Sequence, residues 1–130
     1  MIGAIIGLER QLSHKPAGLR THMLVSFGSA FFVLVPLLIA TAQESREAAV
    51  SRVIQGITAG VGFLGAGEIV RESQQELRLA NIQGLTSAAA IWVCAALGIA
   101  AGCGLWQMGL IGAFLSLLVL TVFKKLEKRR

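Results

Sequence analysis

The chain has 130 residues, of which 55% are hydrophobic and only 15% are charged. A soluble globular domain usually carries about 25% charged residues, so this composition excludes an ordinary soluble domain and indicates a membrane protein. The net charge is +5, the sequence contains no tyrosine, and no aromatic residues are interleaved with the basic ones. We therefore assign the basic balance to anionic lipid head groups and expect no nucleic-acid partner.

The first element in the chain is a short apolar stretch, MIGAIIGL, which ends before Glu9. A helix that spans a bilayer needs roughly 20 apolar residues, so residues 1–8 are too short to span. The stretch has no basic region before it and no cleavage site, so it is not a signal peptide. We interpret it as the last turns of a truncated helix whose start lies upstream of Met1. A short interfacial anchor is the alternative.

Three long runs without Asp, Glu, Lys or Arg follow, and they predict four membrane spans. The third run is long enough for two spans, with a turn at Ala101–Gly104. The sequence thus predicts an all-α integral membrane protein over residues 1–123, a bundle of four transmembrane helices plus the truncated fifth. A basic tail, residues 124–130, completes it. The predicted spans cover residues 20–42, 53–70, 83–102 and 105–123.

The distribution of Lys and Arg predicts the orientation. Polar segments lie between and after the apolar runs. The first, third and fifth of them, residues 9–20, 71–78 and 124–130, must face the same side of the membrane, and they hold ten of the twelve basic residues. Cytoplasmic loops carry the excess of Lys and Arg. We therefore expect a multi-pass protein of the bacterial inner membrane with a cytoplasmic C-terminus and with Gln43–Arg52 on the outer side.

The stretch GVGFLG spells G-x-G-x-x-G, which in other contexts binds a dinucleotide. That function needs a preceding strand and an acidic residue about 20 positions on, and LANIQGLTSAAA has no acid. In a membrane helix, small residues instead allow close packing, and we expect glycine-rich close packing here. The glycines expected at helix contacts are Gly56, Gly60, Gly62, Gly65, Gly67, Gly98 and Gly102.

Four motifs resemble the MgtC/SapB family in the family's own order. They are GLERQ at 7–11, KPAGLRTHMLVSFGSA at 15–30, GFLGAGEIVR at 62–71 and GLTSAAAIWVCAALGIAAG at 84–102. The resemblance implies an all-helical bacterial inner-membrane module of about five spans, here without the cytoplasmic ACT-like domain of some members. The chain departs from the family at Glu68, where an apolar residue is usual, and at Gln83, where an Arg is common.

The resemblance also implies a role linked to magnesium homeostasis, survival under stress or virulence. Two functions of different classes stay open. One is a non-enzymatic membrane regulator that binds a partner, such as the proton-driven ATP synthase. The other is a small transporter of Mg²⁺ or of a proton-coupled ion. A homo-oligomer is compatible with either function.

The polar residues of these motifs are predicted to converge at the cytoplasmic rim. Glu68 is the one acid inside its apolar run, and we expect an ion pair with Arg71, three residues on, or a transport role. Arg20 has no acid within four residues on its own helix, so we expect it to bridge Glu9 and the Glu68/Glu72 pair. The candidate functional rim comprises Glu9, Arg10, Arg20, Glu68, Arg71, Glu72, Gln83 and Thr86.

The remaining reactive residues predict no catalytic residue, metal site or cofactor. Cys94 and Cys103 are about 13.5 Å apart along one helix and on opposite faces, too far apart for a disulfide. His14 and His22 lack any H-E-x-x-H context, and we expect His22 at the head-group level. The chain is therefore predicted not to be an enzyme.

Overall fold

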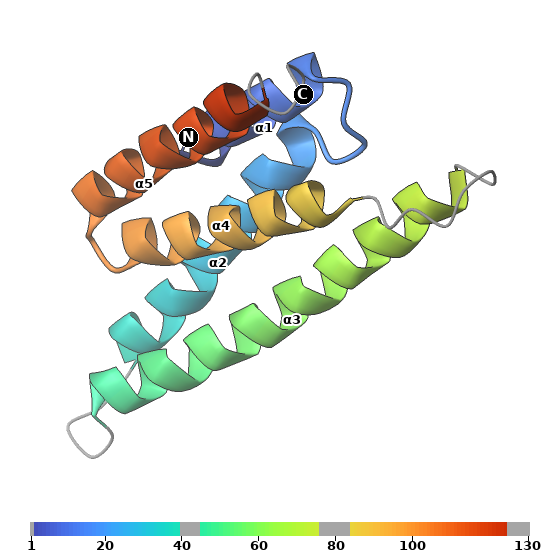
Figure 1. Cartoon of the computed structure of the whole chain (residues 1–130). Helices are drawn as coiled ribbons and strands as arrows, with labels where there is room; N and C mark the ends of the chain where they lie inside the picture. The colour runs from blue at the N-terminus through green and yellow to red at the C-terminus, as the bar shows by residue number, and fades with distance from the viewer. Residues whose placement is uncertain (1, 40–44, 76–83, 125–130) are drawn as a thin grey trace.

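The computed structural model describes residues 2–39, 45–75 and 84–124, with their side chains except those of residues 72–75. No strand occurs in these ranges, and the prediction of an all-α membrane bundle is confirmed. The helices are α1 (Ile2–Leu12), α2 (Leu19–Ile39), α3 (Arg46–Gln75), α4 (Leu85–Gly102) and α5 (Trp106–Leu118), which continues into the π-helix η1 (Val119–Phe123) (Figure 1).

Four segments are long and apolar enough to cross a bilayer: Leu19–Ile39, Arg46–Arg71, Leu85–Gly102 and Trp106–Phe123. They fall on the four predicted stretches, but α3 begins several residues earlier than the predicted 53. Ser45 explains the difference, because its hydroxyl accepts a hydrogen bond from the Ala48 amide at 3.2 Å and so caps the helix. The apolar run marks the part suited to the membrane, whereas the cap marks where the helix begins.

The helices form a bundle in which α2 and α4 are central. α2 packs most extensively against α4, and α1 contacts α2, α4 and α5. Within the described ranges α3 contacts only α2 and α4. Figure 1 shows α3 along one side of this central pair, with α1 and α5 on the opposite side. Successive helices run in opposite directions. As a result, α1, α3 and η1 finish at the same end of the bundle at which α2 and α4 begin.

α1 is a full member of this bundle, which disagrees with the alternative of an interfacial anchor. Its residues Gly3, Ile6, Gly7 and Arg10 are buried. They recur at spacings of three and four, so they share one face of the helix. A Cβ at Gly3 would lie 2.5 Å from the His22 carbonyl oxygen. This contact shows how closely α1 approaches the backbone of α2.

The glycines of α4 also lie against the backbone of α2. A Cβ at Gly98 would collide with the carbonyl oxygen of Ser26, and one at Gly102 would lie 2.6 Å from that of Ala30. A side chain at either position would force the two helices apart. Small residues allow backbones to approach in a membrane, where the hydrophobic effect does not drive helices together.

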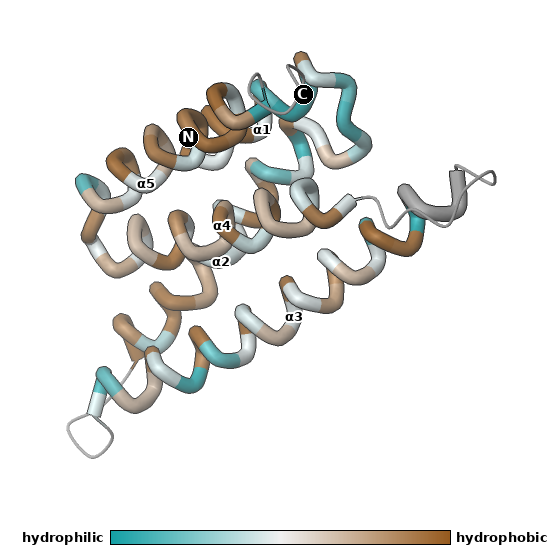
Figure 2. Tube along the Cα trace, viewed as in Figure 1, coloured by the Kyte–Doolittle hydropathy of each residue, from teal (hydrophilic) through white to brown (hydrophobic). Residues whose placement is uncertain are grey.

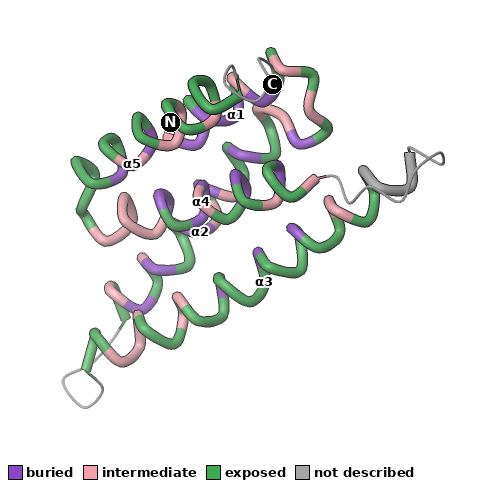
Figure 3. Tube along the Cα trace, viewed as in Figure 1, coloured by how far each residue is buried: buried purple, intermediate pink, exposed green. Residues whose placement is uncertain are grey.

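The glycines of α3 differ from the prediction. A Cβ at Gly65 would lie 3.3 Å from the Ala88 side chain, but Cβ atoms at Gly56, Gly60, Gly62 and Gly67 would have no neighbour within 4 Å. The expected contacts at these four positions are therefore absent from the described part of the chain. The reason lies in the arrangement of the bundle: α3 stands at its edge, and most of its circumference faces outward (Figure 3).

Two local features shape the chain between α4 and Lys124. Gly104 has a φ of +83°, and the Leu105 amide donates to the Ala100 carbonyl at 2.9 Å, which closes α4 with a left-handed residue. Farther on, the Thr121 hydroxyl donates to the Leu117 carbonyl at 2.7 Å inside η1. Side-chain bonds of this kind compete with the helical ladder, in keeping with a wider turn here.

Large apolar side chains cover the outside of the bundle. Phe31, Phe32, Phe63 and Phe114 are all exposed. Figure 2 shows that hydrophilic residues gather instead at the α1–α2 connection and near the start of α3. Exposed apolar surface on this scale requires a non-aqueous environment, so the outer faces are suited to the lipid bilayer.

Candidate functional site

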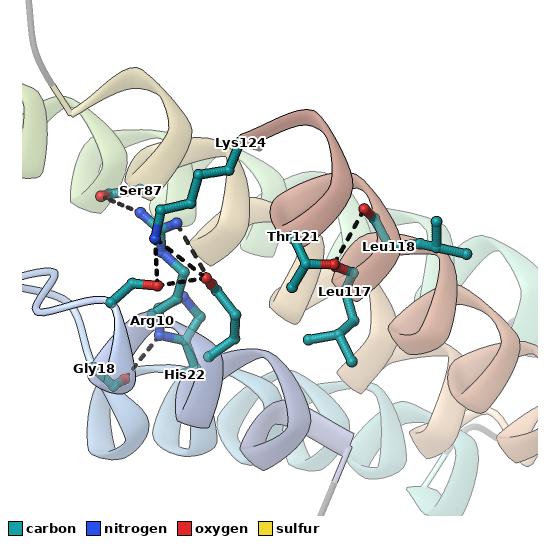
Figure 4. A network of polar contacts seen from close by, with 10 residues as sticks. Arg10, Gly18, His22, Ser87, Leu117, Leu118, Thr121 and Lys124 are labelled. Carbon is teal, nitrogen blue, oxygen red and sulfur yellow. Dashed lines mark hydrogen bonds and ion pairs between the residues drawn. The ribbon is translucent and has the colours of Figure 1, made fainter. Parts of the chain in front are cut away.

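The most conspicuous polar feature is a cluster at the end of the bundle where α1 ends and α2 begins (Figure 4). We call it the polar cluster. Its members come from α1 and the turn after it, from α2, from α4 and from the residue after η1. They are Glu9, Arg10, Ser13, His22, Ser87 and Lys124.

Arg10 is the centre of the cluster and is only 3% exposed. Its Nη2 donates a hydrogen bond of 3.0 Å to Ser87 Oγ, and its Nη1 lies 3.6 Å from Glu9 Oε2. An isolated buried charge is costly unless it is paired and hydrogen-bonded. Ser87 is 1% exposed, so the bond fixes the end of α1 to the first turn of α4 inside the bundle.

Glu9 connects α1 to Lys124, the residue that follows η1. The Ser13 hydroxyl donates to Glu9 Oε1 at 2.6 Å. Lys124 Nζ donates to Ser13 Oγ at 2.7 Å and lies 4.0 Å from Glu9 Oε1. The carboxylate is 10% exposed and the ammonium group is 52% exposed, so the ion pair lies at the border between the bundle and its surroundings.

His22 lies on the inner side of the cluster and is fully buried inside the bundle, and its position at the level of the head groups stays a prediction. Its Nδ1 lies 2.8 Å from the Gly18 carbonyl oxygen. A carbonyl oxygen only accepts, so Nδ1 carries the hydrogen. Nε2 is buried without a hydrogen-bond partner.

Only some of the predicted rim residues take part in the polar cluster. Arg20 is exposed, and no ion pair joins it to Glu9 or Glu68 in the described ranges. The predicted bridge from Arg20 is therefore wrong for these two acids. Glu9 instead contacts Arg10 and Lys124. His22 faces inward, and the two-residue step back to Arg20 turns its side chain by about 200° around the helix.

Glu68 also differs from the prediction. Arg71 is exposed, and no ion pair between the two is found among the described side chains. Glu68 is half-buried, and its Oε1 is buried without a hydrogen-bond partner. Thr86 is exposed. Glu72 and Gln83 lie outside the described side chains.

Sequence reasoning missed Ser87, although it stands next to Thr86 in GLTSAAA. One step along a helix rotates a side chain by 100°, and here that step separates an exposed hydroxyl from a buried one. The position of a residue in the motif indicates at which end of the bundle it lies. It does not indicate on which face of the helix its side chain lies. Lys124 was assigned to the tail, and only the fold brings it beside Glu9.

No group of three or more His, Cys, Asp or Glu side chains that could hold a metal ion occurs among the described residues. What the polar cluster does chemically is neutralise buried charge and connect helix ends. It brings α1, α4 and the end of η1 together.

A second feature is an apolar groove of about 670 Å³ between α2 and α3. The one hydroxyl-bearing residue on its walls is Ser29, and glycines from both helices lie along it. We call it the α2–α3 groove. Its lining residues are Leu24, Val25, Gly28, Ser29, Phe32, Val53, Gly56, Ile57, Gly60, Val61 and Leu64.

Comparison with known proteins identifies relatives over nearly the whole chain. Protein SrpB of Synechococcus elongatus is 52% identical, covering 98% of this chain and 72% of the relative. A putative magnesium transporter, YhiD of Escherichia coli, is 42% identical, covering 95% of this chain and 56% of the relative. Protein MgtC of Salmonella typhimurium is 35% identical, covering 99% and 51%. The chain thus spans about half the length of the last two.

No solved structure matches the chain. The sequence profile of the MgtC family, in contrast, matches residues 1–129. This range includes all the helices described above and the whole polar cluster. The chain belongs to the MgtC family.

Proposed function

We propose that the chain is a non-enzymatic regulator of the bacterial inner membrane, linked to magnesium homeostasis, stress survival or virulence, that acts by binding another membrane protein. The observation that carries the proposal is the engagement of Glu9 and Arg10 with other residues of the bundle. Groups used in this way stabilise the position of helices. These bonds favour the interpretation that the bundle is a rigid scaffold whose outer surface binds a partner.

The α2–α3 groove is the surface we assign to that partner. Both of its walls are helices suited to crossing a membrane, and Gly56 and Gly60 leave the backbone of α3 accessible. Small residues of this kind allow a further helix to pack closely within a bilayer. The proposed occupant is a transmembrane helix of the partner protein, and the proton-driven ATP synthase is the partner to test.

The test fills the groove and leaves the rest of α3 unchanged. The protein is reconstituted with purified ATP synthase, and ATP-driven proton pumping is measured. Gly60→Leu places a side chain in the groove, whereas Gly62→Leu adds the same side chain to α3 outside the residues that line it. We expect the unsubstituted chain and Gly62→Leu to alter pumping and Gly60→Leu to have no effect.

Equal effects of the two variants, or no effect of the unsubstituted chain, would contradict the proposed partner. A cross-linked dimer formed without the synthase, and lost only in Gly60→Leu, would assign the groove to a second copy of this chain instead.

The orientation of the bundle in the membrane is part of the same proposal. We place the end that holds the polar cluster in the cytoplasm, because the basic segments lie there.

Transport is the second candidate, and one observation favours it. Glu68 has a buried carboxylate oxygen without a partner, and an ionisable group in a membrane helix is a functional candidate by default. The relative in Escherichia coli is named a putative magnesium transporter. In proteoliposomes, Mg²⁺ or proton flux that is lost in Glu68→Gln but kept in Glu47→Gln, at the far end of α3, would favour transport over regulation.

A further inference from the structure

Ser29 carries a buried hydroxyl at the floor of the α2–α3 groove. It is one of the lining residues, yet it is only 4% exposed. Leu24 and Phe32, which line the same wall of the groove, are largely exposed. The two large side chains therefore form the rim of this wall, and the serine lies beneath them.

The hydroxyl of Ser29 lacks the bond that other hydroxyls in the spans make. Thr58, Ser116 and Thr121 each donate to the carbonyl four residues earlier, at 2.8, 2.6 and 2.7 Å. Ser29 makes neither this bond nor any other side-chain hydrogen bond to the described residues. Almost all buried polar groups in proteins are hydrogen-bonded, so this exception requires an explanation.

The depth of Ser29 limits where a bonding partner comes from. The residue lies ten positions from Leu19 and ten from Ile39, the two ends of α2, which is about 15 Å from each end. α2 is long and apolar enough to cross a bilayer, whose hydrocarbon core is about 30 Å thick. Ser29 is therefore at the middle of a spanning α2, where lipid offers no hydrogen-bond partner. A side chain that enters the groove supplies one.

The groove has the length and the openness that a helix requires. On α3 its lining residues run from Val53 to Leu64, about 16.5 Å along the helix axis. Cβ atoms at Gly28, Gly56 and Gly60 would have no neighbour within 4 Å, so both walls leave backbone open to an occupant. Small residues let membrane helices approach closely, and Ser, Thr, Asn and Gln side chains form hydrogen bonds across such contacts.

We propose that the α2–α3 groove selects a transmembrane helix with one uncharged hydrogen-bonding side chain (Asn, Gln, Ser or Thr) at its centre, and that Ser29 is the residue that selects it. This inference rests on the proposed function, because it takes the groove as the site of the partner's helix. A wholly apolar helix leaves the hydroxyl unbonded, whereas a central amide or hydroxyl bonds to it. A charged side chain at this depth adds the cost of a buried charge.

The test compares two peptides on the unsubstituted chain in lipid vesicles. Each peptide is an apolar helix of about 20 residues with a single Asn. The Asn is central in the first peptide, and in the second it is exchanged with a Leu seven positions nearer one end. The compositions are identical, and the exchange moves the amide by about 10.5 Å along the same face. Energy transfer to the labelled protein measures binding. We expect the peptide with the central Asn to bind about threefold to thirtyfold more tightly.

Two variants of α2 identify the source of this preference. Ser29→Ala removes the hydroxyl from the groove, so the two peptides should bind equally. Ser26→Ala is the matched control, because it removes a buried hydroxyl from the same helix that does not line the groove. This variant should keep the full preference for the central Asn.

Equal binding of the two peptides to the unsubstituted chain would overturn the proposal, and this comparison requires no variant to fold. A preference that persists in Ser29→Ala would also overturn it. Equal binding that Gly60→Leu abolishes would retain the groove as a helix site and reject only the role of Ser29. If neither peptide binds, both the groove and the selection by Ser29 are rejected. A clear preference without any effect on synthase pumping would reject the synthase alone, so the two proposals fail separately.

Discussion

At the scale of single residues, the decisive property is the face of the helix on which a polar side chain lies. Thr86 and Ser87 are adjacent, yet one is exposed and the other is 1% exposed and bonded to Arg10. Arg20 and His22 differ in the same way. Sequence motifs placed these residues at one end of the bundle. They could not specify orientation, since α2 and α4 are apolar around most of their circumference and the few polar residues do not show which face is buried.

The Arg10–Ser87 bond predicts a difference between the two neighbours. Ser87→Ala removes the hydrogen-bond acceptor of the buried Arg10 Nη2, and we expect it to lower the free energy of unfolding by about 1–3 kcal/mol. Thr86→Ala is the matched control and should change it by less than about 0.5 kcal/mol. Both are measured by denaturant unfolding in detergent. Equal effects would mean that the bond to Ser87 contributes nothing beyond the loss of a hydroxyl.

At the scale of helices, glycine spacing identified stretches able to pack closely but not the partner of each stretch. Gly98 and Gly102 lie against α2, whereas Gly56 and Gly60 border the α2–α3 groove. The same four-residue spacing occurs in both pairs. What separates them is the position of the helix in the bundle, central for α4 and peripheral for α3. Gly3 and Gly7 escaped prediction because residues 1–8 were interpreted as the last turns of a truncated helix, and no packing partner was assigned to them.

This difference predicts opposite tolerance to the same substitution. Gly98→Ala places a methyl group against the Ser26 carbonyl, and overpacking of this kind typically costs about 1–3 kcal/mol. Gly60→Ala enters open space and should leave stability unchanged or slightly higher, because Ala favours a helix by up to about 1 kcal/mol. Thermal unfolding in one detergent compares them. A Gly60→Ala variant as unstable as Gly98→Ala would show that α3 packs more closely than described.

At the scale of the whole molecule, composition and charge-free runs were sufficient to predict the membrane class and the number of helices long and apolar enough to span. These properties depend on sums over about 20 residues, so single errors average out. Helix ends were less accurate. Ser45 starts α3 well before its apolar run, because capping is a local property that hydropathy does not detect.

The bundle also constrains which segments share a side of the membrane. Between Arg46 and Lys124 the chain contains three segments long and apolar enough to cross a membrane, α3, α4 and α5 with η1, which predict three crossings. An odd number of crossings places Arg46 and the C-terminal tail on opposite sides. From the excess of Lys and Arg we predict that the tail, Arg130 included, faces the cytoplasm. Reporter fusions after Arg46 and after Arg130 should therefore report the outer and the cytoplasmic side. Two fusions on the same side would contradict the three crossings. A cytoplasmic signal after Arg46 together with an outer signal after Arg130 would agree with the three crossings. It would show that the basic residues do not set the orientation of the bundle.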